Sequence, residues 1–381
     1  MTYDVIVVGA GPAGSAAAAE CAALGLDTLC IEEHGTIGYP VQCAGLLSTD
    51  AFGECRVSKR SVLNEVSGAR IVSGRGSEVV IDAGTTKAYV VDRGTLDFEM
   101  AKNAADAGAE FLLKTSVCGV GTDHVRTRGP DGSREYGFRV LIAADGPRST
   151  IARMRGMQRA EVFLSGIQAD LCGKCNPRLV EIYPDASPEF FGWSIPTGPG
   201  RIRVGLCGTN DVRNRFSAFL KRFGTDPVHL VFGTIPLGVM PKTFGSRTLY
   251  VGDAAGFAKP TSGGGVYTGV RSARHAAAVA AEACTSNDFS DDLLSKFGQK
   301  WQDDFGRELL LGFQLFRCRN NLNVEDTDAL IRALNDPEII RTIEENGDMD
   351  RPGQLVKCLL VKPAVLRLLA PLIRSGLRPF L

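Results

Sequence analysis

Three acidic residues follow short apolar stretches in this 381-residue chain, and each could accept hydrogen bonds from ligand hydroxyls: Glu32, Asp145 and Asp253. Such carboxylates act together only if the stretches before them are parallel strands, because the carboxyl ends of parallel strands meet at one crevice of a doubly wound sheet. The segment 9–14, GAGPAG, separates the first apolar run from an Ala-rich stretch and has the spacing G-x-G-x-x-G. These features predict a site for a nucleotide-containing ligand.

The first 33 residues predict a strand, a glycine turn, a helix and a second strand that ends at Glu32. Gly9 allows the tight turn, Gly11 lets the backbone approach a pyrophosphate, and Gly14 lets helix and strand pack closely. The free N–H groups of the helix N-terminus favour phosphates. Because Glu32 would accept the ribose hydroxyls and repel a 2′-phosphate, we expect FAD or NAD rather than NADP.

The acidic residue furthest along the chain favours the longer of these two ligands. Asp253 follows an expected strand over 248–251 and precedes a glycine-rich turn, behind which a helix is expected from Gly265 to about Cys284. NAD would need only the first strand end, whereas the ribityl chain of FAD could donate to Asp253. The helix N-terminus at 263–266 would then face the isoalloxazine and stabilise the charge of the reduced ring by roughly 1 kcal/mol. Alone, Asp253 would be an ordinary helix cap.

Length, charge and cysteine content bound the class of protein. A chain of 381 residues suggests two or three domains. Its 43 basic and 43 acidic residues cancel, so nucleic acid is not expected as a partner. Eleven scattered cysteines without a signal peptide fit a reducing cytosol. No apolar run approaches the ~18 residues of a membrane-spanning helix, so we expect a cytoplasmic protein.

The remaining patterns predict an α/β fold with a Rossmann-type FAD-binding domain assembled from discontinuous segments, an antiparallel β-rich substrate domain and a helical C-terminal region. The FAD-binding domain is expected at 1–52, 88–156 and 245–285. The β-rich domain is expected at 53–87 and 157–244, with one helix over about 210–224, and the helical region at 286–381. Within the FAD-binding segments, strands are expected over 109–117 and 135–143.

Four segments are similar to the para-hydroxybenzoate-hydroxylase-like FAD-dependent oxidoreductases: GAGPAG with Glu32, VDRGTLD around Arg93, ADG at 144–146 and LYVGDAAGFAKPTSGGGV at 249–266. Within that group, three further segments resemble the geranylgeranyl reductase family: PVQCAGLLS at 40–48, KPTSGGG at 259–265, and F-x-W-x-I-P at 191–196 with Gly205. The resemblance covers residues 1 to about 300. Archaeal members reduce the isoprenoid double bonds of digeranylgeranylglycerophospholipids, and plant and bacterial members act on geranylgeranyl diphosphate or chlorophyll side chains.

The resemblance also implies roles for individual residues. Those expected to contact FAD come from all three FAD-binding segments: Ala13, Glu32, Cys43, Ala44, Leu46, Arg93, Val117, Asp253, Gly264, Gly265 and Val266. Phe191, Trp193 and Pro196 would line a lipid cavity over the flavin. The sequence departs from the family pattern at Phe191, which replaces a Tyr, at Ile195, which replaces a Phe, and at Lys259, where an Asp is usual. These departures leave the shape of the substrate open.

Saturating an isolated double bond requires a hydride from flavin N5 and a proton from a donor, and Cys43 is the candidate catalytic residue. As hypotheses, Cys43 donates that proton or forms a redox-sensitive pair with a C-terminal cysteine such as Cys318. A small buried thiol is the plain alternative. The four histidines lack metal-ligand spacing, and Cys172-x-x-Cys175 has no second pair nearby, so no metal site is expected.

Two further features concern partners. The sequence contains one dinucleotide fingerprint, so electrons must come from a transient donor, either NAD(P)H or reduced ferredoxin. The tail 355–381 interleaves basic residues with leucines, which is typical of an interfacial helix on anionic lipid. A helix packed on the core with its basic face in water is the alternative. A lipid substrate favours peripheral contact with the inner face of the cell membrane.

The sequence therefore favours FAD-dependent saturation of isoprenoid double bonds in geranylgeranylated membrane lipid precursors. A flavin-dependent monooxygenase or halogenase is the alternative within enzymes, since FGWSIP is similar to the halogenase pattern W-x-W-x-I-P except that Phe191 replaces the first Trp. A non-catalytic FAD-binding scaffold is the alternative of another class. The large β-rich insert favours an enclosed substrate cavity over a scaffold.

Overall fold

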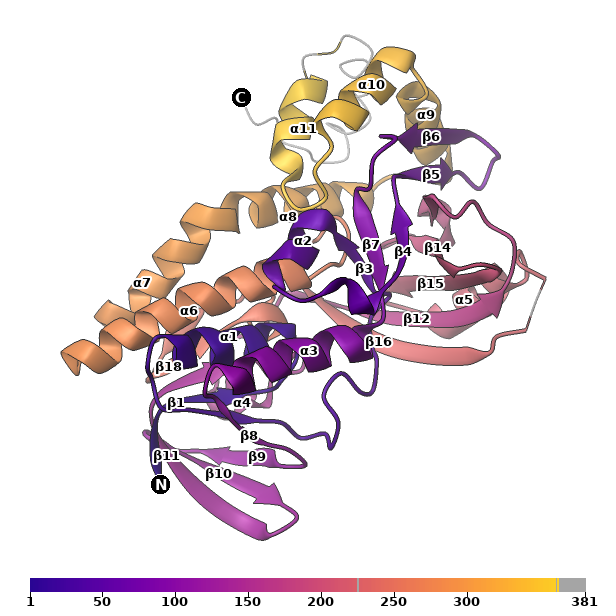
Figure 1. Cartoon of the computed structure of the whole chain (residues 1–381). Coiled ribbons are helices and arrows are strands. Elements are labelled where there is room, and N and C mark those ends of the chain that lie inside the picture. The colour runs from indigo at the N-terminus through magenta and orange to yellow at the C-terminus, as the bar shows by residue number, and fades with distance from the viewer. Residues whose placement is uncertain (225, 361, 363–381) are drawn as a thin grey trace.

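The computed structural model describes residues 1–224, 226–360 and 362. Its largest sheet joins strands from distant parts of the chain (Figure 1). Across that sheet the strands follow the order β17 (Phe244–Gly245), β18 (Thr248–Tyr250), β11 (Gly132–Ala143), β1 (Thr2–Val8), β2 (Thr28–Ile31) and β8 (Glu110–Leu112), with β10 (His124–Gly129) and β9 (Ser116–Val120) added beside β11. The pairings of β1 with β2 and β11, and of β11 with β18, are parallel. The carboxyl ends of these strands therefore meet at one edge.

Alanine-rich helices pack on this sheet closely enough to bring its distant segments together. Helix α1 (Pro12–Ala23) lies between α3 (Arg93–Asp106) and α6 (Val266–Ser286), and it contacts both (Figure 1). Alanines of both helices are buried: Ala16, Ala17 and Ala18 of α1, and Ala273, Ala276, Ala277 and Ala280 of α6. A Cβ at Gly269 of α6 would lie 3.4 Å from the Cβ of Ala13. Small side chains on both helices therefore allow their backbones to approach. As a result α1, which follows the G-x-G-x-x-G turn, packs against the segment 245–285 of the expected FAD-binding domain.

A second, seven-stranded sheet forms the β-rich part. Its strands follow the order β16 (His229–Leu237), β12 (Val162–Cys172), β15 (Arg201–Gly208), β14 (Gly192–Gly198), β13 (Leu179–Tyr183), β5 (Gly68–Val72) and β6 (Glu78–Asp82). Helix α5 (Val212–Leu220) covers one face, where Phe216 and Phe219 pack on Val204 and Leu206. The opposite face carries Leu164 and other apolar side chains that face away from α5. A small sheet of β3 (Leu46–Ser48), β7 (Ala88–Val91) and β4 (Val62–Val66) accompanies the two large ones.

The C-terminal part is helical as far as it is described. Its helices are α7 (Asp291–Trp301), a π-helical turn (Gln302–Gly306), α8 (Arg307–Arg319), α9 (Val324–Leu334), α10 (Pro337–Asn346) and α11 (Pro352–Leu360). Helices α9 and α10 lie beside β6, and α11 packs on α8 and α10 (Figure 1). Within the described part of the chain, no helix is long and apolar enough to cross a membrane. Most of the tail 355–381 lies outside the described residues.

Several expected elements have different bounds. The single strand expected over 109–117 is two strands, β8 and β9, because Lys114 adopts φ = +52° and turns the chain between them. The helix expected over 210–224 spans Val212–Leu220, and the strand expected over 135–143 begins at Gly132.

The division into domains remains a prediction. Strands β5 and β6 share the sheet of β12–β16, whereas β4 pairs with β7.

Candidate active site

The turn between β1 and α1 has the geometry of a phosphate-binding turn. Gly9 has φ = +98°, and a Cβ added there would lie 2.4 Å from the carbonyl oxygen of Ala144. A Cβ at Gly14 would lie 1.8 Å from the carbonyl oxygen of Gly9, so α1 can pack here only with glycine. At Gly11, no described atom beyond its chain neighbours lies within 4 Å of the Cβ position. The turn therefore fits the pyrophosphate of FAD at the helix N-terminus.

Glu32 lies at the end of β2, beside this turn. Its Oε2 accepts a hydrogen bond of 2.8 Å from the N–H of Ala10. Its Oε1 accepts one of 2.9 Å from the N–H of His34 and lies 2.7 Å from His34 Nδ1. The N–H of Thr115 donates to the carbonyl oxygen of Glu32 at 2.9 Å, which brings Val117 to the same corner of the sheet. Glu32 and Val117 are thus placed where the adenosine of FAD would lie.

Asp253 lies in the 3₁₀ turn after β18 (Gly252–Ala255) and borders the start of α6. Its Oδ1 is 2.6 Å from the Cβ position of Gly265, so the carboxylate lies against the helix N-terminus only because residue 265 is glycine. Burial raises the pKa of Asp253 to about 6, and the Arg93 guanidinium opposes that rise. Gly264 and Val266 flank Gly265 at the same helix end. The arrangement fits the ribityl chain and ring of FAD.

Arg93, the first residue of α3, connects Asp253 with the proposed catalytic cysteine. Its guanidinium makes two hydrogen bonds to the Asp97 carboxylate, of 2.8 and 2.9 Å. Burial would lower the pKa of Arg93, but Asp97 and Cys43 raise it further, so the guanidinium stays charged. The N–H of Gly45 donates a hydrogen bond of 3.4 Å to the Cys43 sulfur, and the Arg93 guanidinium interacts electrostatically with the same thiol. One backbone donor therefore positions this sulfur near the Arg93 guanidinium.

The loop that carries Cys43 is held against the β-rich sheet, on the face opposite α5. Gln168 Nε2 donates to the Cys43 carbonyl oxygen at 2.9 Å, and Arg203 Nη1 donates to that of Ala44 at 3.0 Å. Ala44 and Leu46 also pack into an apolar cluster that includes Ile195. The expected cofactor residues of this loop are therefore positioned jointly by the FAD-binding and β-rich segments.

A second thiol lies near Cys43, and the sequence analysis did not single it out. Cys207 on β15 is fully buried; burial, aided by the neighbouring Cys43, raises its pKa to about 12. Neither Cys43 nor Cys207 forms a disulfide. Strand alternation, which places residues 203, 205 and 207 on one face, is the sequence signal that could have found it. Cys318 is buried on α8, and its pairing with Cys43 remains a hypothesis.

Two of the three expected substrate residues share the face of the sheet that meets the Cys43 loop. The rings of Phe191 and Trp193 lie 6.3 Å apart edge to face, and Phe190 stacks on Phe191 at 4.3 Å. Among the described residues, no acceptor lies within hydrogen-bond distance of the buried Trp193 Nε1, which a ligand could therefore satisfy. Pro196 lies opposite Ile202, whose side chain packs under α5, so strand alternation places Pro196 on the other face.

Three glycines leave part of the strand backbone on this face without side-chain cover. Gly166 on β12 and Gly233 on β16 are direct neighbours across the strands. A Cβ at Gly233 would lie 2.7 Å from the carbonyl oxygen of Gln42, and one at Gly205 would lie 2.4 Å from Trp193 Cζ2. The Cys43 loop and the indole therefore rest directly on the strand backbone. Each glycine lies on a different strand, so the sequence shows the three residues but not the register that aligns them.

Asp145, the other acidic residue expected at a strand end, is occupied within the protein. It accepts hydrogen bonds of 2.7 Å from Ser149 Oγ and 2.9 Å from the N–H of Ile151, at the start of α4 (Thr150–Met154). Burial raises the pKa of Asp145. Both of its carboxylate oxygens are used at the start of α4, whose N-cap residue is Ser149. Glu32 and Asp253 remain the expected acceptors for ligand hydroxyls. Over residues 1–224, 226–360 and 362, no group of three or more His, Cys, Asp or Glu side chains could hold a metal ion.

Three features define the class of FAD-dependent oxidoreductases: a dinucleotide turn, an acidic strand end beside it, and a second acid at the start of α6. A family model described as "lycopene cyclase protein" matches residues 4–337. A geranylgeranyl bacteriochlorophyll reductase-like protein from Thermoplasma acidophilum has a TM-score of 0.88 at 27% identity, over 97% of this chain and 99% of that one. A flavin-dependent brominase shares the fold, with a TM-score of 0.73 at 18% identity over 98% of this chain and 99% of its own.

Curated relatives narrow this class to one family. Digeranylgeranylglycerophospholipid reductase 2 of Methanothermobacter thermautotrophicus is 32% identical over 360 residues, which are 89% of this chain and 93% of the relative. Digeranylgeranylglycerophospholipid reductase of Methanosarcina mazei is 31% identical, over 89% of this chain and 90% of the relative. The chain belongs to the family of these geranylgeranyl lipid reductases. The family resemblance drawn from the motifs is thereby confirmed.

Proposed function

We propose that this protein catalyses the FAD-dependent reduction of isoprenoid double bonds in geranylgeranylated membrane lipid precursors. The observation that carries this proposal is the apolar face of Phe191 and Trp193, set against the loop of Cys43. An apolar surface lined by aromatic rings suits a polyprenyl chain. The reductase names of relatives aligned over most of the chain favour reduction over the cyclase named by the family model.

Each group of site residues has a role in this reaction. The glycine turn and Glu32 bind the ADP part of the cofactor, and Asp253 with the N-terminus of α6 orients its ribityl chain and ring. Bound FAD supplies a hydride to one carbon of the double bond. Cys43 gives a proton to the other carbon, because its sulfur accepts from the N–H of Gly45 and lies near the Arg93 guanidinium in the loop that faces the aromatic rings. Phe191 and Trp193 exclude water from the prenyl chain.

We propose that a transient donor, either NAD(P)H or reduced ferredoxin, delivers the electrons. The support is the sequence itself, which carries one G-x-G-x-x-G fingerprint and therefore one expected resident dinucleotide. We further propose that the protein works in the cytoplasm and contacts the inner face of the membrane through its basic tail. A substrate that is a membrane lipid requires such access.

The experiment that tests the function is an anaerobic turnover. The purified holoenzyme is photoreduced, a geranylgeranylated lipid is added, and flavin absorbance and product mass are followed together. Reoxidation with a mass gain of two hydrogen atoms per bond is expected for the reductase. A flavin that stays reduced until air enters would favour the monooxygenase or halogenase alternative. A bound flavin that cannot be reduced would favour the scaffold.

A further inference from the structure

Lys259 and Asp350 form an ion pair inside the protein, next to the cofactor-binding segments. Lys259 Nζ lies 2.5 Å from Asp350 Oδ1 and 2.9 Å from the carbonyl oxygen of Met349. Only 8% of Lys259 and 3% of Asp350 remain exposed. The second carboxylate oxygen accepts a hydrogen bond from the Ser48 hydroxyl. Both charges are therefore satisfied by protein groups, with little screening by solvent.

The pair joins three segments that are far apart in the sequence. Lys259 opens the turn KPTSGGG, where its N–H donates to the carbonyl oxygen of Gly264 at 3.0 Å and its own carbonyl accepts from the N–H of Gly263 at 2.8 Å. A Cβ at Gly264 would lie 3.3 Å from Lys259 Cε, so the lysine side chain lies against the turn. Ser48 ends β3, just beyond the loop of Cys43. Asp350 lies between α10 and α11.

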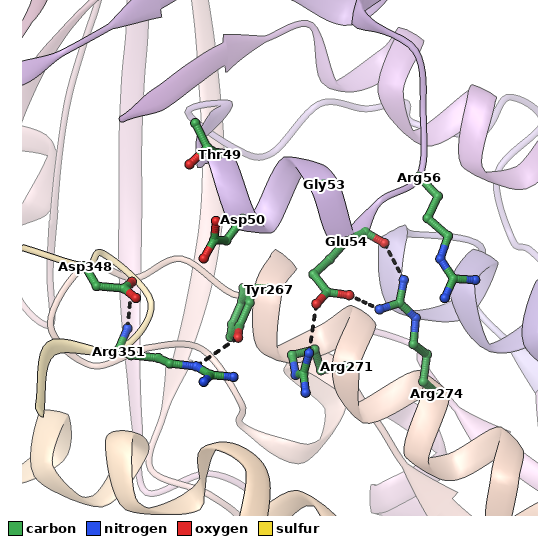
Figure 2. A pocket seen from close by; sticks show the side chains of 10 residues that line it. All are labelled: Thr49, Asp50, Gly53, Glu54, Arg56, Tyr267, Arg271, Arg274, Asp348 and Arg351. Carbon is green, nitrogen blue, oxygen red and sulfur yellow. Dashed lines mark hydrogen bonds and ion pairs between the residues drawn. The ribbon is translucent and has the colours of Figure 1, made fainter. Parts of the chain in front are cut away.

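Figure 2 shows that the loop 348–351 is also tied to the start of α6. Asp348 Oδ1 accepts a hydrogen bond of 3.0 Å from the N–H of Arg351. Arg351 Nε donates at 3.1 Å to the hydroxyl of Tyr267, which lies in the first turn of α6. Asp350 is therefore held between two fixed neighbours, and its carboxylate meets Lys259 in a defined position.

The cavity drawn in Figure 2, of about 520 Å³, contributes no separate ligand site to this inference. Four arginines line it, but Arg271 and Arg274 both bind Glu54, and Arg56 binds Glu20. Its charges are balanced within the protein. The neighbouring Lys259–Asp350 pair is the group that touches the cofactor-binding turn directly.

We propose that Lys259 and Asp350 are positioning residues that hold the turn 259–265 against the flavin and, by pairing their charges, keep either charge alone from shifting its reduction potential. This inference rests on the FAD assignment and is independent of which lipid is reduced. The turn leads into the N-terminus of α6, which is expected to face the pyrimidine end of the flavin, where negative charge collects on reduction. In the intact pair the two opposite charges largely cancel each other's effect at the flavin. Removing one leaves the other unpaired in a medium of low dielectric constant.

The test measures the midpoint potential of the holoenzyme at pH 8 in Lys259→Met, in Asp350→Asn and in the double variant. Asp350→Asn leaves the ammonium group unpaired and is expected to raise the potential, whereas Lys259→Met leaves the carboxylate and is expected to lower it. Each single change should alter the reduction equilibrium at least tenfold, about 30 mV for two electrons. The double variant should return towards the wild-type value, because it removes both charges.

Control variants separate this electrostatic role from folding. Lys242→Met removes an exposed ion pair with Asp291 and is expected to leave the potential unchanged. If Lys259→Met fails to fold, Asp350→Asn and the double variant still decide the sign. Potentials that shift in the same direction in both single variants, or that do not shift at all, would overturn the proposal. If the midpoint potentials shift as expected but the enzyme reduces no prenyl lipid, the role of the Lys259–Asp350 pair is supported and the proposed function is refuted.

Discussion

Asp253 is a carboxyl group that folding places in an environment unfavourable to its charge. Burial raises its pKa from 3.8 to about 6, so the folded protein binds this proton more tightly than the unfolded chain does. The resulting stabilisation is fully present below about pH 4 and is lost as the pH rises to about 6. At about 1.4 kcal/mol per pKa unit, the loss is at most about 3 kcal/mol.

Replacing Asp253 with Asn should therefore stabilise the apoprotein at pH 7.5, by at most about 3 kcal/mol. The gain should shrink as the pH falls towards 5, because the wild-type carboxyl group is then largely protonated. Thermal unfolding of both apoproteins across this range is the measurement. FAD affinity should fall in the same variant, because an amide accepts ribityl hydrogen bonds less strongly than a carboxylate. A stability gain that does not change with pH would contradict this account.

Cys43 and Cys207 are neighbouring thiols with different expected contributions to turnover. Cys43→Ser should lower kcat about 100-fold or more at unchanged flavin content, because a hydroxyl is a much weaker acid than a thiol. Cys207, whose pKa of about 12 keeps it protonated, lies buried behind the loop, so Cys207→Ala should retain most turnover and lose stability instead. Anaerobic single-turnover kinetics give both values. Full activity in Cys43→Ser would remove its catalytic role.

At the scale of elements, the positions of glycines in neighbouring strands determine how closely other groups approach the face of the β-rich sheet. Gly205→Ala would push its new methyl group into Trp193 and Gln168, the residue that fixes the Cys43 loop. Overpacking of this kind costs about 1–3 kcal/mol of folding stability. Because the indole that lines the substrate face is displaced, KM for the lipid should also rise about tenfold or more. The flavin content should not change. Gly53→Ala is the matched control and should leave KM unaltered, because no described atom beyond its chain neighbours and its own helix backbone lies within 4 Å of the Cβ position.

The cofactor turn could be predicted from the sequence, whereas the substrate face could not. Gly9, Gly11 and Gly14 lie within one βαβ unit, so local spacing is sufficient to predict the turn that they form. Gly166 and Gly233 become neighbours only through the register of β12 and β16, which are far apart in the chain. The same limit explains Pro196, which the motif groups with Trp193 but the pleat of β14 places on the other face.

At the scale of the whole molecule, an ion pair between distant segments explains why Lys259 departs from the family pattern. Lys259 stands where an acidic residue is usual, and the sequence alone offers no reason for it. The structure supplies a carboxylate from Asp350, 91 positions later in the chain. The fold class and the family could be predicted because they depend on local motifs. The connection of the C-terminal helices to the cofactor turn could not, because it depends on contacts between segments far apart in the sequence.

The C-terminal tail is the last feature that matters at this scale, since a membrane lipid must reach the site. Truncation after Lys362 keeps the described helix α11 and removes Arg367, Arg374 and Arg378 together with the leucines between them. At about 1 kcal/mol for each basic residue near an anionic surface, binding to anionic vesicles should weaken about 100-fold. Turnover of detergent-dispersed substrate should be retained, because the described site residues all precede the truncation. Vesicle co-sedimentation and detergent-based turnover give the two values.

A full-length variant with Gln at these three arginine positions separates charge from apolar contact. If attraction to anionic lipid dominates, this variant should bind as weakly as the truncation, and wild-type binding should fall as salt is raised. If apolar insertion dominates, the Gln variant should bind like the wild type at every salt concentration. Vesicle binding that survives the truncation itself would place the membrane contact elsewhere on the molecule. The tail would then fit the alternative of a helix packed on the core with its basic face in water.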